Sequence, residues 1–154
     1  MSRFSSALVR AVKTPAARTS KPRRAAAVVL GAFLTFAGIS HLSFARSEFQ
    51  AQVPDWVPMD KDLVVLVSGV AEIGLGASLI LWRKRRVPVG LASAAFFIAI
   101  FPGNISQYVT QTDAFGLSTD RDRLIRLFFQ PLLVLWALWG TGAWQALRAE
   151  QRKR

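Results

Sequence analysis

The chain has 154 residues, of which 52% are hydrophobic and 20 are Lys or Arg, and its formal net charge is +11. Its mean hydropathy of +0.31 is high for so basic a chain. This combination indicates that apolar residues gather in membrane-spanning segments and that the charges lie between them. The absence of cysteine and the single histidine exclude disulfides, thiol redox relays, iron–sulfur clusters and histidine-rich metal sites.

Four segments are long and apolar enough to cross a bilayer, which takes about 20 mostly apolar residues. They are residues 25–44, 63–82, 87–108 and 124–147. The loops and tails left over are too short for a soluble domain with its own core. We therefore expect an all-α fold, with residues 25–147 forming an integral membrane antiparallel four-helix bundle.

The two ends of the chain form basic tails. Residues 1–24 contain no acid, and Phe4, Leu8 and Val12 recur every four residues. This tail is predicted to be disordered or to form a short interfacial helix, although its composition also resembles an organellar transit peptide. Residues 148–154 form the second tail.

The distribution of charge predicts the orientation of the spans. The two tails and the turn at residues 83–86 hold 15 of the 20 basic residues. The other two loops hold most of the acidic residues. The positive-inside rule then places both termini in the cytoplasm of a multi-pass protein of the cell membrane. Basic residues distributed in this way orient the chain in the lipid bilayer, so we do not expect nucleic acid as a partner.

The first span carries small residues on one helix face. Gly31, Leu34, Gly38 and His41 are three or seven residues apart, and small residues on such a face permit close helix contact. His41 falls at the outer end of this span. The loop that follows has prolines at positions 54 and 58, which forbid a regular helix. We expect this loop to form a short ordered flap over the outer mouth of the bundle.

The second span carries a carboxylate near its middle, Glu72, flanked on its own face by Ser68, Gly69 and Gly76. An ionisable group at that depth costs at least ~2.5 kcal/mol on insertion scales. Glu72 is therefore expected to face other helices and to find a partner there.

The last two spans also contain polar residues. In the third, Phe101-Pro102-Gly103-Asn104 is predicted to break the outer part of the helix. In the fourth, Arg126 and Gln130 lie one turn apart and Pro131 follows.

Five polar residues fall in the outer half of the predicted bundle and are expected to form one ligand-binding pocket. They are His41, Glu72, Asn104, Arg126 and Gln130. Glu72 and His41 are the candidates for holding and moving protons, and the two amides offer donors and acceptors. We assign no catalytic residue, because no nucleophile, base and orienting group come together, and no metal site. By residue spacing, Glu72 lies about 15 Å inside the outer membrane boundary and His41 only about 5 Å inside it. We therefore expect a tilted helix, a bridging water or a shifted span boundary to be needed for the two side chains to meet.

The order of motifs resembles that of the DoxX-like family of small four-helix bacterial membrane proteins. The motifs are Gly38-Ile39-Ser40-His41, Val53-Pro54-x-Trp56-x-Pro58, Ser68-Gly69-Val70-x-Glu72-Ile73-x-Leu75-Gly76, Phe101-Pro102-x-Asn104-Ile105 and Arg126-x-x-x-Gln130. The resemblance covers about residues 25–147. It implies a four-helix membrane fold, a site at His41, Glu72, Asn104 and Gln130, and a link to membrane redox complexes.

Three functions remain open. The leading one is binding of a quinone-like or other small apolar ligand by a protein that is not an enzyme on its own. It would act as a subunit of a membrane redox complex, beside a partner subunit or a second copy of itself. The alternatives are a small proton-coupled transporter or exporter, and a non-catalytic structural or assembly partner whose polar residues only fix the bundle.

Overall fold

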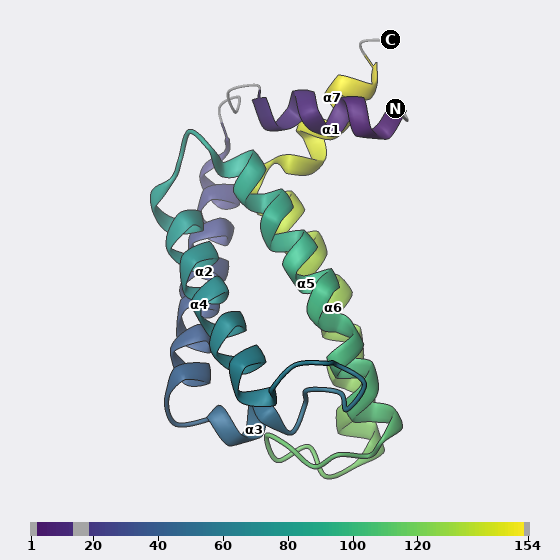
Figure 1. The fold of residues 1–154 in the computed structure, drawn as a ribbon. Helices are drawn as coiled ribbons and strands as arrows, with labels where there is room; N and C mark the ends of the chain where they lie inside the picture. Colours follow the sequence, from purple (N-terminus) through teal and green to yellow (C-terminus); the bar gives the residue numbers. More distant parts are fainter. Residues whose placement is uncertain (1–2, 14–18, 153–154) are drawn as a thin grey trace.

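The computed structural model describes residues 3–13 and 19–152, and within these ranges the chain is helical and has no strand (Figure 1). The helices are α1 (Arg3–Lys13), α2 (Lys21–Leu42), α3 (Arg46–Gln50), α4 (Lys61–Leu81), α5 (Arg86–Val109), α6 (Asp120–Thr141) and α7 (Ala143–Arg152). Among the described residues, four helices are long and apolar enough to cross a membrane, namely α2, α4, α5 and α6.

These four helices correspond to the four predicted segments, and each begins one to four residues earlier than predicted. The largest difference is at the end of the fourth, which was predicted to reach residue 147. The helix stops at Thr141, because Gly142 adopts a left-handed conformation with φ of +76°. Glycine tolerates this conformation and often ends a helix in this way. The chain then continues as the separate helix α7.

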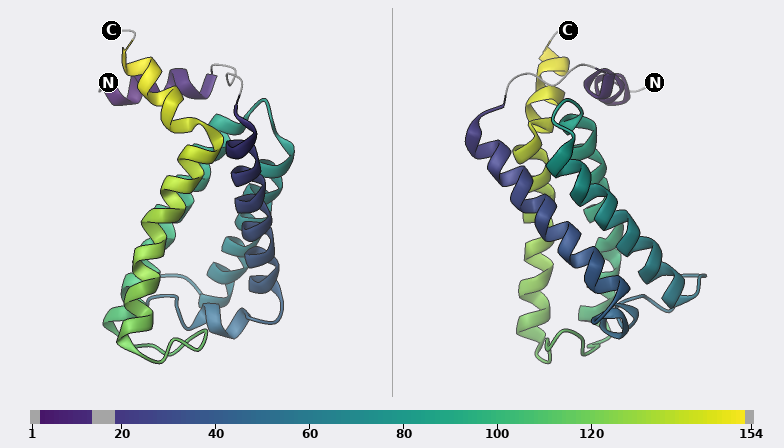
Figure 2. Two further views of the ribbon diagram at one scale, coloured as in Figure 1. Left: turned by 180° about the vertical axis from the view of Figure 1, so that it is seen from behind. Right: turned by 90° about the vertical axis from the view of Figure 1, so that its left-hand side faces the viewer.

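The long helices are arranged as two pairs, α2 with α4 and α5 with α6 (Figures 1 and 2). The pairs lie close together at the end of the molecule that carries α1 and α7, which we call the tail end. They separate toward the opposite end, which carries α3 and the loops of residues 43–60 and 110–119 and which we call the loop end.

Backbone contacts between glycines hold α2 against α4. A Cβ atom added to Gly31 would lie 2.7 Å from the carbonyl oxygen of Gly76. One added to Gly38 would lie 2.5 Å from the carbonyl oxygen of Gly69. The predicted glycine face is therefore a helix contact, at which side chains larger than hydrogen do not fit.

The tail end is closed by small and apolar residues. Leu30 and Ala137 are fully buried in a cluster that joins both helix pairs, and the Trp136 indole donates to the Ala26 carbonyl at 2.9 Å. Beyond this cluster, α1 packs on α7, and the Arg10 guanidinium lies 3.2 Å from the Glu150 carboxylate. Residues Arg3–Lys13 of the N-terminal tail are thus helical.

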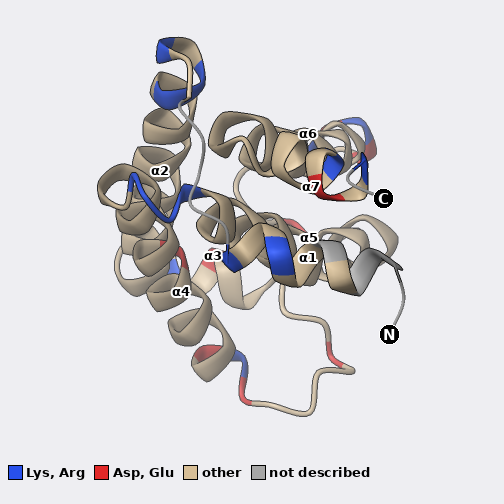
Figure 3. Cartoon of the chain, turned by 90° about the horizontal axis from the view of Figure 1, so that it is seen from above, with Lys and Arg blue, Asp and Glu red and all other residues tan. Residues whose placement is uncertain are grey.

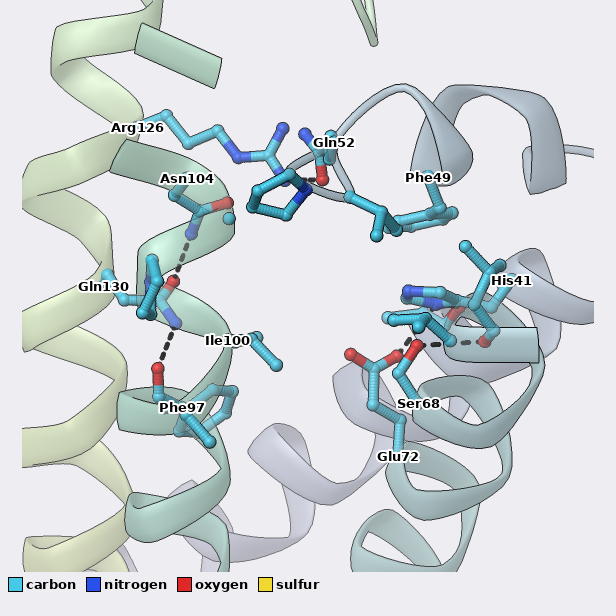
Figure 4. Close-up of a pocket in the computed structure, with 18 of the residues that line it drawn as sticks. His41, Phe49, Gln52, Ser68, Glu72, Phe97, Ile100, Asn104, Arg126 and Gln130 are labelled. Carbon is cyan, nitrogen blue, oxygen red and sulfur yellow. Dashed lines mark hydrogen bonds and ion pairs between the residues drawn. The ribbon is translucent and has the colours of Figure 1, made fainter. Parts of the chain in front are cut away.

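The predicted break at Phe101–Asn104 is wrong, because α5 continues through Pro102 and Gly103 to Val109. Proline removes one hydrogen bond of the helix, and neighbouring groups can compensate for such a loss inside a membrane protein. The carbonyl that Pro102 leaves without its helical partner is that of Ile98. The uninterrupted helix keeps Asn104 on the same face as Phe97, directed toward the space between the two pairs (Figure 4).

Candidate functional site

A cavity of about 530 Å³ lies between the two helix pairs, toward the loop end. All five polar residues predicted from the sequence line it. Figure 4 shows them in two groups that face each other across the cavity. His41 and Glu72 come from α2 and α4, whereas Asn104, Arg126 and Gln130 come from α5 and α6. Most of the remaining lining is apolar, including Leu34, Phe97, Ile100 and Leu133.

The first group is a buried carboxylate beside an imidazole. The side chains of His41 and Glu72 are 8% and 6% exposed, and the Nδ1 atom of His41 lies 3.0 Å from the Oε2 atom of Glu72. Nδ1 also lies 2.9 Å from the Ala37 carbonyl oxygen, which can only accept, so this nitrogen carries a hydrogen. That hydrogen is donated to the carbonyl. The Glu72 Oε2 atom is then buried without a hydrogen-bond partner among the described residues.

The side chains of His41 and Glu72 meet although the two residues lie at different levels of the α2–α4 pair. His41 is next to the last residue of α2, whereas Glu72 lies three turns inside α4. Relative to the contact of Gly38 with Gly69, His41 lies three residues toward the loop end and Glu72 lies three residues toward the tail end. The two side chains therefore bridge about 9 Å along the helix axes.

The second group is a hydrogen-bonded set of amides. The Asn104 amide donates to the Gln130 side-chain oxygen at 2.9 Å, and Gln130 in turn donates to the Phe97 carbonyl at 2.6 Å. Both side chains are buried. Neither residue reaches Glu72, which lies on the opposite wall (Figure 4).

Arg126 is held on this second wall by two side-chain amide oxygens. Its guanidinium donates to Gln52 at 2.9 Å and to Gln107 at 3.3 Å, and the Gln52 amide donates to Gln107 at 2.9 Å. It is therefore not the basic group beside Glu72, a position that His41 occupies. The sequence-based site omitted both glutamines. Gln107 lies one turn after Asn104 on the same helix and could have been found by this spacing, whereas Gln52 lies in an irregular segment without periodicity.

Aromatic side chains cover the cavity at the loop end. The Phe49 ring stacks on the His41 ring with centroids 3.3 Å apart and meets the Phe115 ring edge-on at 4.6 Å. The Arg126 guanidinium lies over the Phe115 ring, 5.1 Å from its centroid. Through these contacts, side chains of α3 and of the loop 110–119 connect the two walls. No sequence pattern indicated that Phe49 or Phe115 would lie at the cavity.

Ion pairs and hydrogen bonds hold the covering segments in place. Glu48 accepts a hydrogen bond from the backbone N–H of Phe115 at 2.5 Å. The Arg46 guanidinium pairs with the Asp62 carboxylate through two contacts, one of them at 2.6 Å. Arg123 pairs with Asp113 and, at 2.8 Å, with Asp120. These contacts keep α3 and the loop 110–119 over the cavity.

Residues 51–60, which we call the flap, also line the cavity. Gln52, Val53, Pro54, Trp56 and Val57 contribute to its wall. A Cβ atom on Gly103 would lie 3.3 Å from the Gln52 carbonyl oxygen, so the flap touches α5. At its far end the Lys61 ammonium lies 2.6 Å from the Asp55 carboxylate. The predicted ordered loop over the mouth is thus present.

No group of three or more His, Asp or Glu side chains that could hold a metal ion occurs in the described part of the chain. The groups that face the cavity can accept, donate and exchange protons. The site is therefore suited to a ligand held by hydrogen bonds in apolar surroundings.

A family model described as a domain of unknown function, DUF8561, matches residues 30–141. The chain belongs to the DUF8561 family. The family region begins inside α2 and ends at the last residue of α6, so it contains the whole cavity and leaves α1 and α7 outside. Searches of curated proteins and of solved structures find no match.

Proposed function

We propose that this DUF8561 protein is a multi-pass membrane protein that binds a flat, lipid-soluble molecule with carbonyl or hydroxyl groups, such as a quinone, in the cavity between its helix pairs. The observation that carries the proposal is the buried carboxylate of Glu72, which lines the cavity and whose Oε2 atom, 3.0 Å from His41 Nδ1, has no hydrogen-bond partner among the described residues. A buried polar atom left unpaired costs about 1–3 kcal/mol. A ligand hydroxyl, or a proton shared with a ligand carbonyl, would remove that cost.

The charge distribution supports insertion as an antiparallel bundle with both termini in the cytoplasm. Figure 3, which looks onto the tail end, shows Lys and Arg at the start of α2, in the turn before α5, and on α1 and α7. The aspartates lie in the segments of the loop end, with Glu72 as the acid inside the bundle. Basic residues on one side of four spans are typical of the cytoplasmic side of the cell membrane.

The two polar walls define the chemistry of the ligand. Glu72 and His41 form one wall, while Asn104, Gln130 and Arg126 form the other. A ring with an oxygen at each end would place one oxygen at each wall. The aromatic and aliphatic side chains between the walls would contact its faces. Small-molecule sites commonly combine such an apolar lining with a few placed polar groups.

Glu72 and His41 are the residues that would handle protons in this site. When the carboxylate is ionised it accepts from a hydroxyl of the reduced ligand, and when it is protonated it donates to a carbonyl of the oxidised ligand. His41 holds its Nδ1 hydrogen next to this carboxylate. On the basis of the DoxX-like motifs, we propose further that the chain serves a membrane redox complex, with the electron transfer performed by a partner subunit.

The test is to purify the protein in mild detergent and to identify bound molecules by native mass spectrometry and extraction. Ubiquinone and menaquinone analogues with short side chains are then titrated against the wild type and Glu72→Gln, which keeps the shape of the side chain and removes the charge. We expect a bound quinone-like molecule in the wild type and weaker binding in the variant.

A matched control is Gly74→Ala in the same helix, because a Cβ atom at Gly74 has nothing within 4 Å. Its binding should equal that of the wild type. Failure of the wild type to bind any of these analogues would refute the proposal. Flux of an ionic substrate into proteoliposomes that depends on Glu72, without quinone binding, would favour a transporter instead. Loss of stability in Glu72→Gln as the sole effect would favour a structural role.

A further inference from the structure

Two phenylalanines mark a side opening of the cavity. Phe33 in α2 and Phe129 in α6 both line it, yet their exposed fractions are 55% and 57%. A side chain that lines a cavity and is also more than half exposed lies at its mouth. The two residues belong to helices from different pairs, so this mouth lies between α2 and α6, on the side seen in the left view of Figure 2.

The helix contacts explain why the mouth lies at this height. Nearer the tail end, α2 and α6 are joined by the Trp136 hydrogen bond to Ala26 and by the close approach of Gly140 to Ala27. Toward the loop end the two helices separate with their pairs (Figure 2). The cavity reaches α2 from Phe33 onward and α6 as far as Leu133.

The depth of the mouth along the helices determines whether it opens to water, to lipid headgroups or to hydrocarbon. Phe33 lies nine residues before the end of α2, and Phe129 lies nine residues after the start of α6. At 1.5 Å per residue, both are about 14 Å from the loop end of their helices. The hydrocarbon layer of a bilayer is about 30 Å thick. For helices that span it, the mouth therefore opens near the middle of the hydrocarbon, away from water and headgroups.

We propose that the ligand is an amphiphile with a long apolar tail, which enters sideways from the bilayer between Phe33 and Phe129 and leaves its tail in this mouth. The inference rests on the proposed function and adds the entry route and the tail. The ring passes the two phenylalanines and reaches the polar walls, while the tail remains among lipid chains. A tail of isoprene or alkyl units suits this path, because it never has to leave the hydrocarbon.

The alternative route leads past the flap. Trp56 also lines the cavity and is 68% exposed, but it belongs to the flap at the loop end, as the polar Gln52 does. The hydrogen bonds of Gln52 to Arg126 and Gln107 hold the flap closed there. A water-soluble ligand would use that route, and a lipid-soluble one would use the side mouth.

The experiment narrows the side mouth and measures the rate of entry. The double variant Phe33→Trp/Phe129→Trp and the control Phe36→Trp/Phe128→Trp are placed in lipid nanodiscs. Phe36 and Phe128 are exposed on the same two helices, at 62% and 67%, and do not line the cavity. Two probes are used: a quinone with a ten-carbon side chain, and the same ring without a side chain.

We expect the mouth variant to slow association of the tailed quinone by at least about tenfold, while the control variant leaves it unchanged; in mutants of one site such changes in association rate span one to three decades. A tailed quinone with a photoreactive group at the end of its chain should label α2 and α6 near Phe33 and Phe129 in the wild type. This labelling keeps the test decisive if the double variant does not fold.

Labelling confined to the flap around Trp56, or equal association rates in all three proteins, would overturn the side entry. If the ring without a tail binds while the tail changes neither rate nor affinity, only this inference fails and the pocket remains. If neither probe binds, the proposed function fails as well.

Discussion

The glycine contact between α2 and α4 can be tested by adding one methyl group. A Cβ atom at Gly38 would lie 2.5 Å from the Gly69 carbonyl oxygen and 2.9 Å from the backbone nitrogen of Ile73. These backbone atoms belong to α4 and can move away only if the whole helix moves. Gly38→Ala must therefore push α2 away from α4, whereas Gly74→Ala places its methyl group in open space.

Comparison of the two variants isolates the free-energy cost of the clash at Gly38. Both replace a helical glycine by alanine and gain about 1 kcal/mol of helix propensity. Only Gly38→Ala adds a clash, and overpacking of this kind costs about 1–3 kcal/mol. Their free energies of unfolding should thus differ by about 1–3 kcal/mol, and each 1.4 kcal/mol of that difference corresponds to a tenfold change in the unfolding equilibrium.

Unfolding by sodium dodecyl sulfate in mixed micelles, followed by circular dichroism, measures this difference. A second readout is ligand binding. A Cβ atom at Gly69 would lie 2.8 Å from the Cβ of His41, so separation of the helices also moves His41 relative to Glu72. Equal stability and equal binding in the two variants would refute the close packing of α2 on α4.

Three further predictions concern the walls and the flap. Gln130→Leu removes two hydrogen bonds, each worth about 0.6 kcal/mol in membrane proteins, so unfolding measurements should show a loss of roughly 1 kcal/mol. Gln52→Leu removes the hydrogen bonds that join the flap to Arg126 and Gln107, so amide hydrogen exchange in the flap should become faster, and unchanged exchange would contradict its anchoring role. The Lys61 ammonium lowers the pKa of the Asp55 carboxyl, first by a hydrogen bond and then by its charge. The pair should therefore persist at neutral pH and be lost as the pH falls through that lowered pKa. Trp56 fluorescence should report the loss in the wild type but not in Asp55→Asn.

Periodicity predicted those parts of the molecule that depend on helix faces. The four long helices and the contact through Gly31 and Gly38 follow from regular spacing of apolar and small residues. The convergence of the five polar residues on one cavity follows from the same rule, because each occupies the face of its helix that turns toward the other pair.

Features set by tertiary contacts were missed or predicted wrongly. The break at Pro102 does not occur, because a single lost hydrogen bond is a smaller effect than the packing of a 24-residue helix. The end of α6 at Gly142 could have been recognised, since glycine is the usual residue at such a position. Phe49, Phe115 and Gln52 reach the cavity from α3 and irregular segments. The path of these segments depends on the Arg46–Asp62 ion pair and on the hydrogen bond from the Phe115 N–H to Glu48, which join residues distant in the sequence.

The central claim is that the Glu72 carboxylate, which lines the cavity, receives a hydrogen bond from a ligand bound there. The most direct measurement compares the affinity of a short-chain quinol, which can donate, for the wild type, Glu72→Gln and Gly74→Ala. Hydrogen bonds to charged groups contribute about 1.5–3 kcal/mol, so we predict that Glu72→Gln binds the quinol at least about tenfold more weakly. Gly74→Ala should match the wild type. Equal affinity of all three proteins for the quinol would contradict the account.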